Sequence, residues 1–249
     1  MPKHIGIAAV SPEGSAFCYR LIGRRASEIA DPSQRPLVTL HNRPFSSYVE
    51  ALNAGDWEAI AGMLAHSAEA LRDAGCDFCV LPDNVAHHAL PMAEANSPIP
   101  WLSMIDLVAQ AIEENGCRTV GLVGTRFVMS GSTYQTALGL KGIHLLVPDE
   151  EHMEDIDRII FREAIYGRVR TESLATVREA VEDFASRGCD SLILGCSGAN
   201  LIMGDAVRLL PAIDPVELLA EEAINHALQG GRGGRGVPGG VSGAVSDAE

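Results

Sequence analysis

The sequence predicts an α/β fold of two pseudosymmetric lobes, each a mainly parallel sheet flanked by helices, with the active site in the cleft between them. Short apolar runs alternate with segments of helical spacing, a pattern typical of a parallel sheet that is covered on both faces. The alternation also occurs twice, because similar sequence segments recur at a nearly constant distance along the chain. Residues 75–87 (GCDFCVLPDNVAH) match residues 188–200 (GCDSLILGCSGAN) at a shift of 113, and residues 4–9 match residues 119–124 at a shift of 115.

In the first half, the apolar runs predict strands and the 3.6-residue spacing predicts helices. Ile60, Leu64 and Leu71 lie on one helical face, and the following Gly75 is a natural helix stop. The expected strands are 3–10, 37–42, 78–81 and 98–103. The expected helices are 16–30, 57–74 and 106–115, with a helical turn at 48–52 and a short helix after Asp83.

The second half repeats this order. We expect strands at 119–124, around Leu145 and Val147, at 191–194 and shortly before Asp214, and helices after Ser132 and over 155–167, 173–187 and 215–228. We therefore assign lobe 1 to residues 1–104 completed by 214–229, and lobe 2 to residues 105–213. Residues 230–249 are rich in Gly and lack periodic apolar residues, which predicts a flexible tail.

Composition limits the classes of function. A net charge of −14 over 249 residues argues against a nucleic-acid or anionic membrane partner, but a few local Arg side chains still allow an acidic small molecule. No secretion signal and no apolar run of membrane-spanning length is apparent. Six cysteines in such a chain predict reduced thiols and a cytoplasmic protein.

The two matched segments each end in polar residues, here called the corner of that segment, and these residues are the candidates for the chemistry. Asp83 aligns with Cys196, and Asn84 aligns with Ser197. Each corner follows a buried strand, at the edge where open α/β sheets bind ligands. A cysteine there can lie at a helix N-terminus, which favours the thiolate, although a buried packing role is the plain alternative.

Two proton-handling groups on opposite sides of one carbon are what stereochemical inversion requires. One group removes the α-proton and the other delivers a proton to the far face. The carbanion needs fixed donors around the substrate carboxylate, and backbone N–H groups after Asp83, Cys196, Ser11 and Ser130 are candidates.

These residues resemble the aspartate/glutamate racemase superfamily, in particular its PLP-independent amino acid racemases. The resemblance covers residues 3–228. It is carried by VGLVGTRFVMSGSTY (120–134), LGCSGANL (194–201) and LPDNVAH (81–87), where the family usually has Cys-Asn-Thr-Ala-His. It implies two similar lobes, a small-molecule amino acid or dicarboxylate substrate, no cofactor, no metal and a homodimer.

The resemblance also implies the roles of individual residues. The family's second-lobe cysteine falls on Cys196, and its first-lobe cysteine falls on Asp83, so the first thiol is replaced by a carboxylate. The candidate substrate contacts are Asn84, Thr125, Ser197, Ser11 and Ser132, with Arg43 and Arg168 as partners for a substrate carboxylate.

The replacement at Asp83 leaves three mechanisms open. The first is a racemase or epimerase of an amino acid, expected to be Asp- or Glu-like, in which Cys196 serves one enantiomer and Asp83 the other. The second is a decarboxylase or isomerase of a small dicarboxylate, such as a substituted malonate or maleate, that uses Cys196 alone. The third is a non-catalytic small-carboxylate binding protein. Burial would raise the pKa of Asp83, and a helix N-terminus would lower it.

Other motifs support weaker hypotheses. Cys76 and Cys79 form a C-x-x-C pattern that leads into a buried strand, so buried structural thiols are favoured over a redox or metal site. His87 or His88 could orient a substrate or pair with Cys196 as in a hydrolase, but a helix-face or capping role is more common. No spacing supports a zinc site, and neither first-strand turn has a dinucleotide-binding or P-loop pattern.

Overall fold

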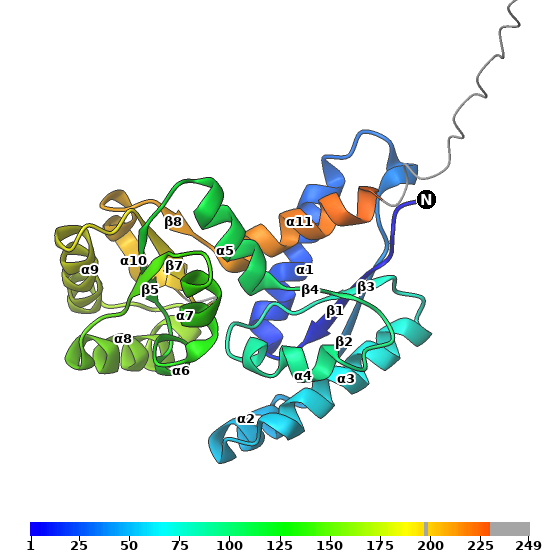
Figure 1. Cartoon of the computed structure of the whole chain (residues 1–249), viewed down its shortest axis with the longest axis horizontal. Helices are drawn as coiled ribbons and strands as arrows, with labels where there is room; N and C mark the ends of the chain where they lie inside the picture. The colour runs from blue at the N-terminus through cyan, green and yellow to red at the C-terminus, as the bar shows by residue number, and fades with distance from the viewer. Residues whose placement is uncertain (197–198, 230–249) are drawn as a thin grey trace, which may run out of the picture.

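The computed structural model describes residues 1–196 and 199–229. It contains two parallel four-stranded sheets, which define lobe 1 and lobe 2 (Figure 1). The first sheet has the order β2 (Val38–Asn42), β1 (Ile5–Ala9), β3 (Phe78–Val80), β4 (Trp101–Leu102). The second sheet has the order β6 (His144–Leu146), β5 (Thr119–Val123), β7 (Ser191–Leu194), β8 (Ala212–Ile213). The two orders are equivalent, which confirms the predicted fold class and the repeat.

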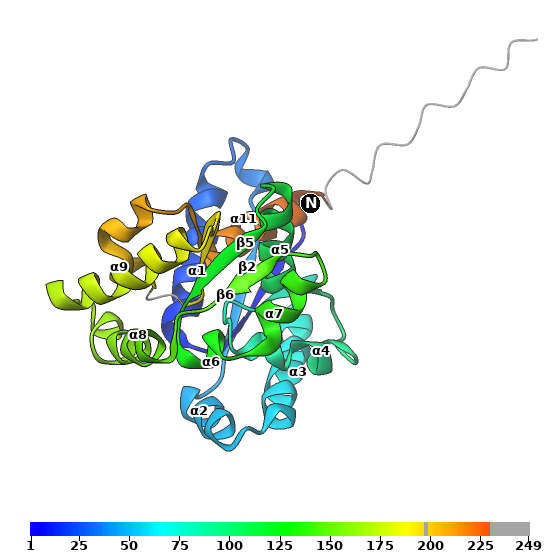
Figure 2. The ribbon, with the colours of Figure 1, turned by 60° about the vertical axis from the view of Figure 1, so that its left-hand side comes forward.

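Helices connect the strands and cover both faces of each sheet, as parallel pairing requires. Figure 2 shows α8 and α9 on one side of the second sheet and α5 and α7 on the other. The earlier helices are α1 (Pro12–Ser27), η1 (Pro32–Gln34), α2 (Phe45–Ala54), α3 (Trp57–Asp73), η2 (Ala86–His88), α4 (Leu90–Glu94) and α5 (Met104–Glu114). The later helices are α6 (Arg126–Met129), α7 (Ser132–Gly139), α8 (Glu150–Arg162), η3 (Ala164–Tyr166), α9 (Thr171–Ser186), α10 (Ala199–Met203), η4 (Gly204–Arg208) and α11 (Pro215–Gln229).

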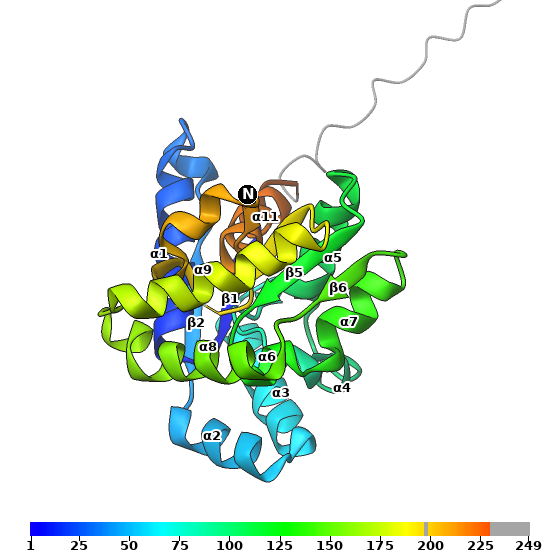
Figure 3. The ribbon, with the colours of Figure 1, turned by 90° about the vertical axis from the view of Figure 1, so that its left-hand side faces the viewer.

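Helices α1, α8 and α2 begin several residues before the expected positions. Helix α1 begins at Pro12 because the Ser11 side chain accepts a hydrogen bond from the Gly14 N–H at 3.3 Å. Helix α8 begins at Glu150, where Asp149 caps the His152 N–H in the same way. The expected turn at 48–52 is the longer helix α2, which projects from one end of the molecule in Figure 3.

The core has one cluster in lobe 2 and one on each face of the sheet in lobe 1. Helix α11 returns from lobe 2 and packs along α1, so that Leu219 and Ile22 belong to the same cluster of lobe 1. Along α5, Met104 packs in that cluster, whereas Ile105 packs in the core of lobe 2. These contacts support our proposed division into 1–104 with 214–229 and 105–213.

The first half of the repeated word has a structural role. Gly75 and Gly188 follow α3 and α9 with φ of 86° and 79°, a left-handed conformation that favours glycine. The carboxylate of Asp77 then accepts a hydrogen bond from the His4 N–H at 2.6 Å. Asp190 does the same for Arg118 and Thr119, at 2.6 and 3.0 Å. Gly-Cys-Asp therefore ends a helix and fixes the start of the neighbouring strand in each lobe.

The remaining sequence predictions concern cysteines and segments outside the site. Cys76 and Cys79 are both buried, and burial raises the pKa of Cys79 to about 12, as expected of packed thiols. No helix within the described residues is long and apolar enough to cross a membrane. Ser197 and the Gly-rich segment 230–249, expected to be a flexible tail, lie outside the described residues.

Candidate active site

Asp83 and Cys196 lie at equivalent positions in the two lobes, just beyond the carboxyl ends of β3 and β7. In lobe 2, the last paired residues of β5 and β7 are Val123 and Leu194, and Thr125 and Cys196 follow them by two residues each. In lobe 1, the last paired residues of β1 and β3 are Ile7 and Val80, and Val10 and Asp83 follow them by three residues each. Thr125 and Val10 therefore occupy equivalent positions in the two lobes.

Two glycines allow the close backbone approach at the sheet edge beside Cys196. The Gly195 N–H donates to the Val123 carbonyl at 2.7 Å. A Cβ atom added at Gly124 would lie 3.1 Å from the Gly195 backbone, which is tighter than ordinary packing. This close approach brings the chain segments before Thr125 and Cys196 into direct contact. Cys196 itself is partly buried and packs against the core of lobe 2.

Asp83 is partly buried as a residue, and its carboxylate is held by local donors. Its Oδ1 atom accepts a hydrogen bond from the Ala86 N–H at 2.9 Å and a longer one from the Tyr48 hydroxyl at 3.5 Å. Burial raises the pKa of Asp83 to about 6, against the lowering effect of the Ala86 and Val85 N–H groups and the Tyr48 hydroxyl. The group therefore titrates close to neutral pH, where a side chain is effective both as a base and as an acid.

His87 has a structural role beside Asp83. Its Nδ1 lies 2.6 Å from the Asp83 carbonyl oxygen, and its Nε2 accepts a hydrogen bond from the Met104 N–H at 3.1 Å. This pattern requires a neutral ring with the proton on Nδ1. Burial lowers the pKa of His87 to about 4, which keeps it neutral. His87 thus fixes the Asp83 loop to the start of α5 and has no ring nitrogen left for a metal or a proton transfer.

His88 follows His87 but is exposed. Its ring packs on Trp57 of α3, with 4.3 Å between the ring centroids. The two histidines that follow the first corner therefore both make local structural contacts. Within residues 1–196 and 199–229, no group of three His, Cys, Asp or Glu side chains has the arrangement of a metal site.

A buried hydrogen bond connects the first corner to lobe 2. The Tyr134 hydroxyl of α7 donates to Asn84 Oδ1 at 2.6 Å. Burial raises the pKa of Tyr134, and the nearby carboxylate of Asp214 adds to this effect, so the phenol stays protonated and donates. Because the Asn84 oxygen is occupied, its amide NH₂ points elsewhere and remains a donor for a ligand.

The other predicted contacts have different surroundings. Thr125 Oγ1 is buried and has no hydrogen-bond partner among the described residues. The Ser11 hydroxyl is used as the cap of α1. Ser132 is exposed at the start of α7 and lines a cavity with Asn84.

The two candidate arginines lie in different places. Arg43 follows β2, is partly buried, and lines a small cavity together with Val10 and Tyr48, so it lies near the Asp83 corner. Arg168 is exposed in the loop after η3, and its backbone N–H donates to the Glu163 carbonyl at 3.2 Å. Only Arg43 shares a described cavity with residues that contact the Asp83 corner.

Two site residues were missed by the sequence reasoning, namely Tyr48 and Tyr134. Tyr134 ends the word at 120–134 that carries the family resemblance, so a signal for it was present. Tyr48 had no comparable signal, because its contact with Asp83 joins residues 35 positions apart.

A cavity of about 120 Å³ lies between the lobes next to these residues. Asn84 and Val85 form its wall in lobe 1, and Phe127, Val128 and Tyr134 form its wall in lobe 2. The site therefore combines a titrating carboxylate, fixed amide and hydroxyl donors, and a partly open space between two lobes. This arrangement suits proton transfer to and from a small bound acid.

Comparisons with known proteins point in the same direction. Residues 7–223 match the family model described as Asp/Glu/Hydantoin racemase. The chain is similar to a Yersinia pestis protein described as a candidate Asp/Glu racemase, with 28% identity and a TM-score of 0.84, covering 91% of this chain and 100% of that one. It is also similar to an aspartate racemase homologue from Pyrococcus horikoshii, with 28% identity, a TM-score of 0.79, and coverage of 91% and 99%. An uncharacterised protein from Pectobacterium carotovorum is 28% identical over 129 residues, which are 49% of this chain and 82% of that protein.

Proposed function

Since the chain belongs to the Asp/Glu/hydantoin racemase family, we propose that it is a cofactor-independent racemase or epimerase of an amino acid that uses Cys196 and Asp83 as its two bases. The observation that carries the proposal is their equivalence. Asp83 and Cys196 follow the third strand of each half, in two sheets of the same order. Val85, two residues after Asp83, packs against the same core of lobe 2 as Cys196. These contacts support a site in which the two groups serve one substrate carbon.

The proposed reaction moves one proton in each half-step. In one direction, the Asp83 carboxylate forms a bond to the α-proton, and the electron pair of the broken C–H bond remains on the substrate as a carbanion. The Cys196 thiol then delivers its proton to the opposite face and becomes a thiolate. In the other direction, the thiolate accepts the α-proton and the Asp83 carboxylic acid donates. A pKa of about 6 allows Asp83 to take both forms.

The substrate α-carboxylate has candidate donors near Asp83. The Asn84 amide, the Thr125 hydroxyl and the Arg43 guanidinium are the three that the surroundings favour. Fixed donors of this kind stabilise the charge that builds up when the α-proton leaves. Ser197, Ser11, Ser132 and Arg168 remain predicted contacts. A homodimer and a cytoplasmic location are also predictions, and sedimentation of the purified protein tests the first.

The test is NMR of L- and D-amino acids incubated with the protein in D₂O. Wild type should incorporate deuterium at the α-carbon and form the opposite enantiomer. Asp83→Asn and Cys196→Ala should each lose the inversion. Matched controls are Asp190→Asn and Cys189→Ala, which alter the same residue types in the structural half of the repeated word and should retain inversion.

Other outcomes would redirect the assignment. Wild-type exchange without inversion that Asp83→Asn leaves unchanged would point to the one-cysteine mechanism and to substituted malonates as substrates. Absence of exchange from every amino acid would refute the racemase proposal, and binding of small carboxylates would then be measured by calorimetry.

A further inference from the structure

The wall of the cavity between the lobes is mainly apolar, and the proposed proton-transfer steps assign no role to it. Trp57 of α3 and Val85 of the Asp83 loop line it from lobe 1. Phe127 and Val128 of α6 line it from lobe 2. The polar groups at its border are neutral amide and hydroxyl groups, such as Asn84 and Ser132, together with the ring of His88.

This cavity is lined by residues that adjoin both reactive corners. On one side, Asn84 and Val85 directly follow Asp83. On the other side, Val128 touches the backbone before Cys196, because a Cβ atom added at Gly195 would lie only 2.9 Å from Val128 Cγ1. A substrate whose α-carbon lies between the two corners therefore has this space available for its side chain.

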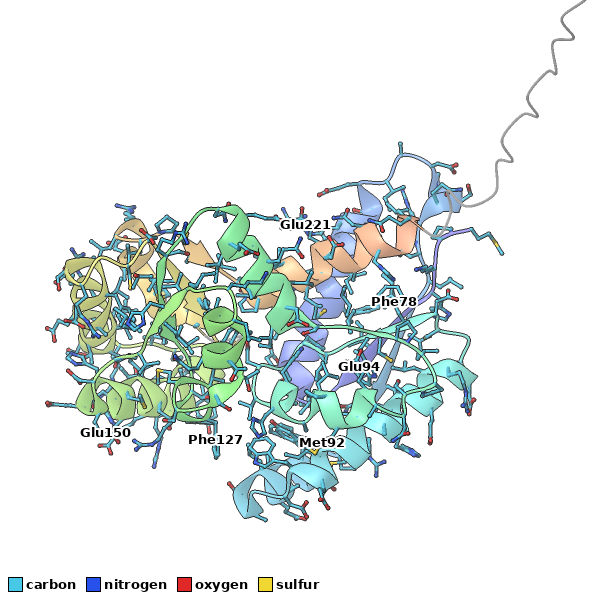
Figure 4. The ribbon with its side chains drawn as sticks, viewed as in Figure 1. Phe78, Met92, Glu94, Phe127, Glu150 and Glu221 are labelled. Carbon is cyan, nitrogen blue, oxygen red and sulfur yellow. The ribbon has the colours of Figure 1, made fainter. Side chains whose placement is uncertain are left out.

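The cavity offers no permanently charged cation to a carboxylate side chain. None of its described lining residues is Lys or Arg. Arg126, the neighbour of Phe127, forms ion pairs with Glu150 and Glu154 of α8. Figure 4 shows Glu150 on the outer part of lobe 2, whereas Phe127 lies at the edge nearer to lobe 1. A side-chain carboxylate in this space would lose hydration without gaining a partner charge, which is costly.

The size of the cavity fits a compact apolar group. Its volume is about 120 Å³, and a dry engineered cavity of about 150 Å³ is large enough to bind benzene. We infer that this cavity binds the substrate side chain and selects amino acids with an apolar side chain, such as Leu, Met or Phe, over Asp and Glu. The inference rests on the proposed racemase function and names its substrate class.

Substrate comparison tests the inference. The ratio kcat/KM for deuterium exchange is measured for L-Leu, L-Met, L-Phe, L-Asp and L-Glu. We expect the apolar substrates to exceed the acidic ones by at least about tenfold, the discrimination typical of one well-filled hydrophobic pocket. Phe127→Ala should lower kcat/KM for the apolar substrates by about tenfold, and Phe127→Arg should raise the rate with Asp and Glu relative to Leu.

Phe161→Ala is the matched control. Phe161 of α8 is 47% exposed and Phe127 is 46% exposed, so both are surface phenylalanines of lobe 2, but Phe161 lines none of the described cavities of the site. Its replacement should leave the substrate ranking unchanged. A wild type that prefers Asp or Glu, or a ranking that Phe127→Ala does not change, would overturn the inference and leave the racemase proposal intact.

A binding measurement separates the two proposals if no amino acid exchanges. Trp57 lines the cavity and is one of two tryptophans, so its fluorescence reports ligand entry, and Trp57→Phe identifies its signal. A Trp57 response to L-Leu or L-Phe that is absent with L-Asp would support the apolar cavity even without catalysis. A response to L-Asp alone, or none to any amino acid, would refute it.

Discussion

Replacing Asp83 with Asn should stabilise the protein at neutral pH while it abolishes racemisation. In the folded chain the pKa of Asp83 is about 6, compared with an ordinary value of 3.8. The carboxyl group therefore holds its proton more tightly in the folded state than in the unfolded state. As pH rises from about 4 to above 6, ionisation favours the unfolded state and the protein loses stability. A difference of about 2 pH units corresponds to about 3 kcal/mol.

Asparagine has nearly the same shape but no charge to bury. Its side-chain oxygen can still accept the Ala86 N–H, so the local turn is kept. The free energy of unfolding of Asp83→Asn should therefore exceed that of wild type by up to about 3 kcal/mol at pH 8. The gain should shrink as pH falls and vanish below about pH 3, where Asp83 is protonated in both the folded and the unfolded state. Urea denaturation followed by circular dichroism at several pH values measures this difference.

Asp190→Asn is a control for which we expect the opposite change in stability. Hydrogen bonds from the Arg118 and Thr119 N–H groups lower the pKa of Asp190, so its contribution to stability is present above its unfolded pKa and is lost as pH falls. That variant should be less stable than wild type at pH 8. The reasoning about Asp83 would be refuted if Asp83→Asn were less stable than wild type at pH 8, or if its gain did not depend on pH.

Three further predictions concern the groups around Asp83. Tyr48→Phe removes a donor that lowers the pKa of Asp83, so the acidic limb of the pH–rate profile should move to higher pH; an unchanged limb would contradict this role. His87→Ala leaves the Met104 N–H without its acceptor and should cost about 2–4 kcal/mol of stability in urea denaturation, whereas His88→Ala, at an exposed position, should cost less than about 1 kcal/mol. Tyr134→Phe leaves Asn84 Oδ1 unpaired. Because an unpaired buried group costs about 1–3 kcal/mol, steady-state kinetics should show a KM raised by about tenfold or more. A change in kcat alone would argue against a role of Tyr134 in orienting Asn84.

The repeat in the sequence predicted the fold because each half encodes the same local devices. Gly75 and Gly188 end helices, Asp77 and Asp190 fix strand starts, and short apolar runs form the buried strands. These devices act between residues close in sequence or at a fixed offset. The alignment of Asp83 with Cys196 followed from the same offset, and the strand register places both residues at equivalent sheet edges.

The surroundings of the corners could not be derived in this way. The contacts of Asp83 with Tyr48 and of Asn84 with Tyr134 join residues 35 and 50 positions apart, and they depend on how α2 and α7 pack. Helix α6 was also missed, because a segment of four residues is too short to show a helical period. It is this helix that brings Phe127 and Val128 to the cavity.

Exchange at the α-carbon in the two single-base variants tests the central claim most directly. Each variant is incubated in D₂O with L-amino acid and, separately, with D-amino acid, and the deuterium content and configuration are measured. If Asp83 and Cys196 act on opposite faces, Asp83→Asn should exchange one enantiomer with retention of configuration, and Cys196→Ala should exchange only the other. Exchange of the same enantiomer by both variants, or inversion that survives in either, would contradict the two-base account.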